Sequence, residues 1–357
     1  MKSDSDNPKN TRPKNTRRNK KLLGLGLLFS MAVLIAVGIT QLGRWSPESA
    51  PVAQAELVAF ANEPIQPIPL SIDLDERRVA IGDKLFHDAR LSSNGSVSCA
   101  TCHALNKGGT DQLAISQGMG GSPIGLNSPT VFNSGFLSRL NWDGSAKTLE
   151  EQANGPIAAV GEMGGMSWPA VVERLEEDDE YRTSFNQVYG DGVTPDNVRD
   201  AIATFQRSLY TPNAPFDKYL RGDEEAISAE AKQGYDLFKA YGCVACHQGV
   251  AVGGNMFQTL GIFGDYFADR GTPVIEADLG RFNVTQNELD RHVFRVPSLR
   301  NVVRTAPYFH DGNATSLQDA IKLMGKYQLG VDIPQNDVDL IMQFLRSLTG
   351  EYQGKSL

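Results

Sequence analysis

Apolar residues recur at the spacing of helices in several parts of this chain. One such stretch begins at Thr194 and Pro195, a pair that suits the cap and first turn of a helix. Its apolar positions are Val198, Ile202, Phe205 and Leu209. Ser316 and Asp319 mark a second helix start, and a last apolar stripe runs over residues 338–348. Because few stretches alternate at every second residue as strands do, the pattern predicts a mainly α fold.

The amino-terminal end carries a different pattern. Residues 22–42 are an uncharged, mostly apolar run that as a helix would span about 30 Å, the thickness of a bilayer's hydrocarbon core. The basic residues 1–21 predict a cytoplasmic tail, with the rest of the chain exported. We expect an uncleaved transmembrane anchor, followed at 43–70 by a Pro- and Ala-rich tether. The alternative is a signal sequence cleaved near Ala55, where small residues flank Gln54.

The exported part consists of two related halves. Each contains a Gly-x-x-Leu-Phe segment followed by a Cys-x-x-Cys-His motif, at 82–103 in the first half and at 234–247 in the second. The halves also share the pattern Asp-Gly-x-Ala-x-Ser/Thr-Leu, at 143–149 and 311–317. Two copies indicate the duplication of one small domain rather than a solenoid.

The Cys-x-x-Cys-His motifs predict two covalently bound c-type haems. The residues concerned are Cys99, Cys102 and His103, and Cys243, Cys246 and His247. The two thiols of each motif would bond to the porphyrin vinyl groups, and the adjacent histidine would reach the iron. A zinc site would need two more ligands per motif, but the chain has only three other histidines and no other cysteine. A thioredoxin-like redox site would not need a histidine after the motif, twice.

The expected fold is therefore two class-I-cytochrome-c-like haem domains packed together behind the transmembrane helix. We place the first domain at residues 71–212 and the second at residues 213–357.

The charge of the chain excludes one class of function. Beyond residue 44 the chain has 25 basic and 40 acidic residues, and such an acidic body repels phosphate, so nucleic-acid binding is excluded. The same charge could attract a basic protein partner.

The sixth ligand of each iron decides its role. Methionine opposite histidine suits electron transfer, whereas an open or exchangeable position suits peroxide. Residue types that could bind there occur at Met119, Met163, Met166, Met256, Met324, His87, His292 and His310. For any single methionine, packing in the core is the competing interpretation.

Longer motifs extend beyond haem attachment. They are LFHDARLS at 85–92, NWDGSAKTLEEQANGPI at 141–157, APFDKYLRGD at 214–223 and TAPYFHDG at 305–312. Together with both haem motifs, they make residues 70–350 resemble the bacterial di-haem cytochrome c peroxidases, a family related to the MauG-type protein-modifying enzymes. The resemblance implies an enzyme that reduces hydrogen peroxide with electrons from another redox protein.

The resemblance also implies a division of labour between the haems. The haem on His103 would be the peroxidatic one, and the haem on His247 would be a high-potential electron-entry centre with Met324 as its distal ligand. MauG-type enzymes carry a tyrosine in that role. Met324 therefore favours a peroxidase, although Tyr327 lies close to it in the sequence.

Three residues around the first haem are implied in the same way. Glu162, in the Gly-rich segment GEMGG, would take a proton from peroxide and return it to the departing oxygen, with Gln152 as its pocket partner. Trp142 would lie between the haems as an electron relay. The competing interpretations are a solvated glutamate and a tryptophan packed in a core.

The family resemblance further implies a calcium ion between the two domains. Its ligands would be the side-chain amide of Asn127 and the backbone carbonyls of Thr305 and Pro307, with waters completing the shell. Such a site could couple the two haem environments.

Met119 departs from the family pattern. Many members have a histidine sixteen residues after the first haem histidine, which ligates the resting peroxidatic iron and leaves when the other haem is reduced. Three outcomes are open: Met119 ligates the iron, no residue does and priming is not needed, or His87 or His292 takes the place. We favour Met119. Met163 is a further alternative, because it aligns with Met324 across a seven-residue insertion.

The sequence thus predicts a di-haem peroxidase anchored in the inner membrane with its catalytic body in the periplasm. One rival is a pure electron-transfer cytochrome in which Met119 blocks the first iron, and another is a MauG-like enzyme that oxidises a protein. The electron donor could be a small cytochrome c, a copper protein or membrane quinol. The sequence leaves open whether the protein forms a homodimer.

Overall fold

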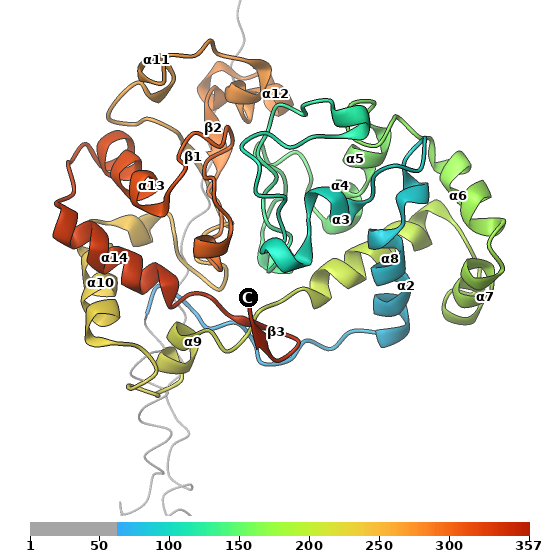
Figure 1. The fold of residues 1–357 in the computed structure, drawn as a ribbon, viewed down its shortest axis with the longest axis horizontal. Helices are drawn as coiled ribbons and strands as arrows, with labels where there is room; N and C mark the ends of the chain where they lie inside the picture. The colour runs from blue at the N-terminus through green and yellow to red at the C-terminus, as the bar shows by residue number, and fades with distance from the viewer. Residues whose placement is uncertain (1–62) are drawn as a thin grey trace, which may run out of the picture. The chain divides into compact units, whose positions relative to one another are not determined.

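Helices dominate residues 63–357, the part of the chain that the computed structural model describes (Figure 1). The helices of the first half are α2 (Glu76–His87), α3 (Cys99–Cys102), α4 (Leu149–Gln152), α5 (Asn154–Ala158), α6 (Trp168–Glu176), α7 (Asp179–Val188) and α8 (Pro195–Ser208). Those of the second half are α9 (Pro215–Leu220), α10 (Ala229–Ala240), α11 (Tyr266–Asp269), α12 (Phe282–Thr285), α13 (Leu317–Met324) and α14 (Gln335–Arg346). The short strands β1 (Phe257–Thr259) and β2 (Val293–Arg295) pair antiparallel, as do β3 (Glu351–Tyr352) and β4 (Lys355–Ser356). The predicted mainly α fold is confirmed.

The helix starts expected from the sequence are present. The Thr194 side chain accepts a hydrogen bond from the backbone N–H of Asn197 at the start of α8. The Ser316 side chain accepts one from the N–H of Asp319 at the start of α13. Each cap satisfies a backbone donor that the first turn of a helix leaves free. The apolar stripe over 338–348 lies mainly on the buried face of α14.

The repeated glycines of the two halves serve the same packing contact. The Gly-x-x-Leu-Phe segments lie in α2 and α10, which pack against α8 and α14 respectively (Figure 1). A Cβ on Gly82 would lie 2.0 Å from the carbonyl oxygen of Ala201, and one on Gly234 would lie 2.0 Å from that of Leu340. Each half is therefore built around a helix pair that only glycine allows to approach so closely.

The two halves make reciprocal contacts where they meet. The sequence repeat pairs Trp142 with His310 and Asn127 with Arg295. The backbone N–H of Arg295 donates to the carbonyl of Trp142, and that of Asn127 donates to the carbonyl of His310, both at 2.8 Å. The two rings of the first pair meet edge to face, with centroids 6.4 Å apart. Such reciprocal contacts are typical of an interface between two copies of one domain.

The described chain begins on the second half. Residues 63–68 form an amino-terminal strap in which Ile65 and Ile68 are fully buried. The strap pairs with Gly249, whose N–H donates to the carbonyl of Pro64 at 2.8 Å. These residues fall within the segment 43–70 that the sequence assigns to the tether, so its last part packs on the protein body.

Arg300 joins the amino-terminal strap to two segments of the second half. Its fully buried guanidinium donates to Asp217 Oδ1 at 2.6 Å, to the Gln66 carbonyl of the strap at 2.8 Å and to the Val250 carbonyl at 2.9 Å. Replacing Arg300 with Met would leave the Asp217 charge buried without its partner. We expect this to cost about 3–5 kcal/mol of folding free energy, measured as a lower Tm.

The double variant R300M/D217N separates charge from packing. It removes both charges, so it should recover most of the loss in Tm. If the single and double variants lose equal stability, the buried charge is not the cause.

Within residues 63–357, no helix combines the length and the apolar character needed to cross a bilayer. The predicted basic tail, the anchor at 22–42 and the cleavage position near Ala55 lie outside the described residues.

Candidate active site

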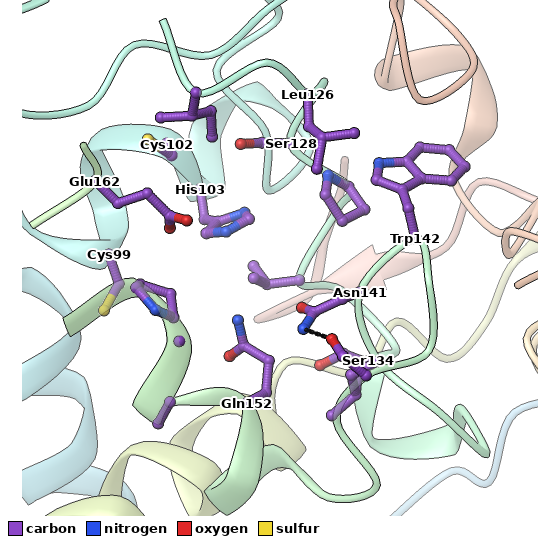
Figure 2. Close-up of a pocket in the computed structure, with 18 of the residues that line it drawn as sticks. Cys99, Cys102, His103, Leu126, Ser128, Ser134, Asn141, Trp142, Gln152 and Glu162 are labelled. Atoms are coloured by element: carbon purple, nitrogen blue, oxygen red, sulfur yellow. Dashed lines mark hydrogen bonds between the residues drawn. The ribbon is translucent and has the colours of Figure 1, made fainter. Parts of the chain in front are cut away.

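A cavity of about 310 Å³ lies beside the first Cys-x-x-Cys-His motif (Figure 2). Cys99, Cys102 and His103 line it together with residues of the loops at 124–134 and 140–145. β2 of the second half also contributes, through Phe294 and Arg295. The cavity is therefore built by the first half and completed by the second.

His103 is held in the state that a metal ligand needs. It ends the short helix α3, and its Nδ1 donates to the carbonyl of Gly109 at 3.3 Å. This bond fixes the tautomer and leaves the lone pair of Nε2 free. Burial lowers the pKa of the imidazole below its usual value, which keeps the ring neutral.

The two thiols of the first motif are not arranged for redox chemistry of their own. Burial raises the pKa of Cys99 to about 12 and that of Cys102 to about 11. A reactive cysteine has a lowered pKa instead. Both thiols are free and lie one turn apart on α3, an arrangement that suits two thioether bonds to one porphyrin.

Glu162 and Gln152 point into the same cavity as His103 (Figure 2). Gln152 is the last residue of α4, a helix capped by Thr148. Glu162 lies in a turn in which its N–H donates to the carbonyl of Ala159 at 3.2 Å. Burial raises the pKa of the Glu162 carboxyl above its ordinary value. The structure thus brings together the three residues to which the sequence assigned the peroxide chemistry.

The loop at 118–122 supports the Glu162 turn from outside. The carbonyl of Glu162 accepts the N–H of Met119 at 2.9 Å. A Cβ on Gly118 would lie 2.0 Å from the carbonyl oxygen of Gly161, so only glycine permits this contact.

We expect Gly118→Ala to displace the Glu162 carboxylate and lower peroxide turnover by about 10–100-fold, because small misplacements of a reacting group are costly. Steady-state assays of mature protein would measure the loss. Gly161→Ala is the matched control, because a Cβ there meets no atom within 4 Å. An equal loss in both variants would contradict the positioning role.

The side chain of Met119 is engaged elsewhere in this structure. Its sulfur accepts a hydrogen bond from Ser93 Oγ at 3.2 Å, and it is not among the cavity-lining residues. Met163 does line the cavity and is 4% exposed, packed in the core of the first half. His292 donates from Nδ1 to the carbonyl of Asp278 at 2.7 Å in the second half. The resting ligand of the first iron stays a prediction.

The second motif is built like the first. His247 Nδ1 donates to the carbonyl of Val252 at 3.4 Å, and burial lowers the pKa of the imidazole to about 4. Met324 ends α13 and is followed by a π-helical turn over Gly325–Leu329. Such turns are frequent at functional sites. The hydroxyl of the buried Tyr327 donates a hydrogen bond to Asp269 at 2.9 Å, so in this structure it is engaged by a protein partner.

Trp142 lies between the cavity and the second half. Its indole N–H donates to the carbonyl of Asn127 at 2.8 Å, and the residue lines the cavity (Figure 2). The ring also packs on an aromatic cluster of the second half, made of Tyr266, Phe267, Phe294 and Tyr327. Trp142 is therefore packed and also bridges the halves, and its role as an electron relay stays a prediction.

The residues proposed for calcium come from segments that touch. Asn127 is buried, and its N–H reaches His310 of the segment 305–312. The Asn127 amide nitrogen donates to the carbonyl of Leu113 at 2.7 Å. Thr305 Oγ1 donates to the carbonyl of Val302 at 3.1 Å, and the calcium site stays a prediction.

Comparison with known proteins identifies the family to which the chain belongs. A sequence model of the di-haem cytochrome c peroxidases matches residues 76–225. The cytochrome c551 peroxidase of Nitrosomonas europaea is 44% identical over 296 residues, which cover 82% of this chain and 86% of that protein. The chain belongs to the di-haem cytochrome c peroxidase family.

Two further similarities extend the family assignment. The cytochrome c peroxidase Ccp of Escherichia coli K12 is 48% identical over 82% of this chain, and the match spans 62% of that protein's length. A crystal structure of a MauG-like protein associated with microbial copper homeostasis has a TM-score of 0.69 and 27% identity, covering 81% of this chain and 94% of the other. The predicted family and a mainly helical fold like that of a MauG-like protein are confirmed.

The family implies haem c, and the first site fits it. The cavity offers two unpaired thiols one turn apart, a neutral imidazole and a largely apolar lining. These are the groups that covalent attachment and axial ligation require.

The sequence did not reveal a buried ion-pair network beside Trp142. His310 Nε2 lies 2.7 Å from Asp278, and Arg270 bridges Asp278 and Asp311 at 2.7 Å each. Three of these side chains are nearly or fully buried. Because the Arg270 guanidinium supplies the cation among these carboxylates, the cluster is an ion-pair network and His310 is already partnered.

Proposed function

We propose that this protein reduces hydrogen peroxide to water with electrons from a small cytochrome c. The reaction consumes two electrons and two protons for each peroxide. The observation that carries the proposal is the convergence of His103, Glu162 and Gln152 in one cavity. The cytochrome c peroxidase names of the relatives from Nitrosomonas europaea and Escherichia coli support the same activity.

In this proposal two haems c are covalently bound, one at each Cys-x-x-Cys-His motif. The haem that Cys99, Cys102 and His103 would hold would supply the iron needed for peroxide reduction. Glu162 would take the proton from one peroxide oxygen and give it to the other, which leaves as water when the O–O bond breaks; the two electrons from the donor and two protons from solvent convert the remaining oxygen to the second water. Its raised pKa suits both steps, because a group of intermediate acidity can accept and give the proton. Gln152 orients the peroxide beside it.

Electrons would enter at the second haem, ligated by His247 and Met324, and cross to the first by way of Trp142. The position of Trp142, which touches both the cavity and the aromatic cluster of the second half, supports this path. A calcium ion held by Asn127 and by the carbonyls of Thr305 and Pro307 would fix the contact between the halves.

We further propose that residues 22–42 anchor the protein in the inner membrane, with the body in the periplasm. The basic flank at 1–21 and the need for exported assembly of haem c support this location. The strap on the second half would then hold the electron-entry haem close to the tether. A copper protein or membrane quinol is the alternative donor, and a homodimer is the alternative to a monomer.

Spectroscopy of the mature protein followed by an activity assay tests the proposal. We expect two haems c, a methionine-ligated high-potential iron, and peroxide-dependent oxidation of reduced cytochrome c. The resting and half-reduced spectra also report whether Met119 binds the first iron. Two bound haems without peroxide turnover would favour the electron-transfer rival. Slow turnover accompanied by oxidation of a partner protein would favour a MauG-like enzyme, against which Met324 argues.

A further inference from the structure

Arg295 is a buried cation that no carboxylate neutralises within the described residues. It lies in β2 of the second half, is 3% exposed and has no ion-pair partner among residues 63–357. Its Nε donates to the carbonyl of Asn141 at 3.0 Å, and its Nη1 makes a long bond of 3.4 Å to the carbonyl of Val296. Burial lowers the pKa of the guanidinium to about 10, which still leaves it charged at neutral pH.

The carboxylate that acts on Arg295 electrostatically does not satisfy this charge. Asp143 attracts Arg295 electrostatically but forms no ion pair with it. The Asp143 carboxylate instead accepts the N–H of Ser145 at 2.9 Å. A buried charge without a counter-ion is costly, so a partner from outside the polypeptide is expected.

Arg295 lines the cavity on the side away from the cysteines. Figure 2 shows Cys99 and Cys102 on one side of His103, and Asn141 and Trp142 on the other. Arg295 is hydrogen-bonded to Asn141, which places it on that second side. In haem c, the vinyl carbons that bond to the thiols lie at the edge of the macrocycle opposite the two propionates. The propionates of a haem bonded to Cys99 and Cys102 would therefore face the Asn141 side.

We infer that Arg295 is the counter-ion of a propionate of the haem held by His103. The inference rests on the proposed haem attachment at the first motif. An arginine can bind a carboxylate through two parallel N–H bonds, and the open Nη2 of Arg295 has no printed or competing partner that would prevent this. The second half thereby supplies charge compensation for the haem of the first half.

This pairing raises the reduction potential of the first haem. A cation beside the propionate offsets its negative charge, which otherwise stabilises the ferric over the ferrous state. The backbone N–H of Arg295 also donates to the carbonyl of Trp142. The same residue would therefore set the potential of the first haem and hold the proposed relay residue in position.

Redox titration of three mature variants tests the inference. In R295Q, we expect the ratio of reduced to oxidised first haem at a fixed potential to fall about tenfold, equal to about 59 mV for one electron. R295K keeps the charge and should restore most of the ratio. R281Q is the matched control, because Arg281 stacks on Phe257 and contacts the Asp143 carbonyl at this interface but does not line the cavity. Its ratio should change less than about twofold.

The result that would overturn the inference is R295Q with both haems bound and an unchanged first-haem potential, or with a shift confined to the second haem. Absence of haem at the first motif of the unaltered protein would instead defeat the proposed function. A crystal structure of the unaltered holoprotein decides the matter even if R295Q does not mature. We expect a guanidinium nitrogen at hydrogen-bond distance from a first-haem propionate, and propionates bound only by other groups would refute it.

Discussion

Replacing Glu162 with glutamine should lower peroxide turnover by about 10²–10⁴-fold, the usual contribution of a positioned acid/base group. Glutamine keeps the size and polarity of the side chain but cannot take up the proton. Both haems should remain bound, because Glu162 belongs to neither attachment motif. Stopped-flow or steady-state oxidation of reduced cytochrome c by peroxide measures the loss, and haem absorption confirms the cofactor content.

Two controls isolate the proton-transfer role of Glu162. Glu173→Gln makes the same chemical change on an exposed position of α6 and should leave turnover unchanged. In the unaltered protein, the carboxylate must be ionised to accept the peroxide proton. Since burial raises its pKa, activity should fall as pH drops through a value above that of an ordinary glutamate. This acid limb should vanish in E162Q, and turnover equal to that of the unaltered protein would refute the role.

Removing one haem at a time should separate electron entry from peroxide reduction. In C99A/C102A, we expect peroxide turnover to fall to the uncatalysed background while the donor still reduces the remaining haem. In C243A/C246A, we expect turnover with the donor to fall to background while the first iron still reacts with peroxide. Rapid mixing with reduced donor, and separately with peroxide, measures both half-reactions.

The two double variants are matched controls for each other, because each removes one attachment motif of the same form. Circular dichroism would verify that the helices remain. Reaction of peroxide at the second haem in C99A/C102A would show that the roles of the two haems are the reverse of those proposed. Full donor-driven turnover by either single-haem protein would show that the two haems do not have separate roles.

Local sequence signals predicted much of this fold because their causes are local. Thr194 and Ser316 cap helices through bonds to residues three positions on, and that spacing is visible in the chain. The two motifs at 99–103 and 243–247 fix their own short helical turns. The prediction that Glu162 and Gln152 lie near His103 depended on the family resemblance, because no local sequence rule connects residues so far apart.

Other features depend on contacts between distant segments. The strap at 63–68 is Pro-rich and has no helical periodicity, which is typical of a tether. Ile65 and Ile68 are nevertheless fully buried against the second half. Arg295 lies in a run of apolar residues, Val293, Phe294 and Val296, where a charge is unusual. This charged residue in an apolar run was the signal that the sequence offered. That Arg295 lines the cavity of the first half follows only from how the two halves pack.

The reciprocal bonds between the halves have a consequence for the speed of electron transfer. Tunnelling between cofactors slows steeply with distance, and in the proposed di-haem protein the gap between the haems would be spanned by main-chain bonds from Arg295 to Trp142 and from Asn127 to His310. Backbone atoms cannot relax as side-chain rotamers do. The tunnelling distance would thus be set by the architecture, and a donor that docks outside would change how often electrons arrive but not how far they must travel inside.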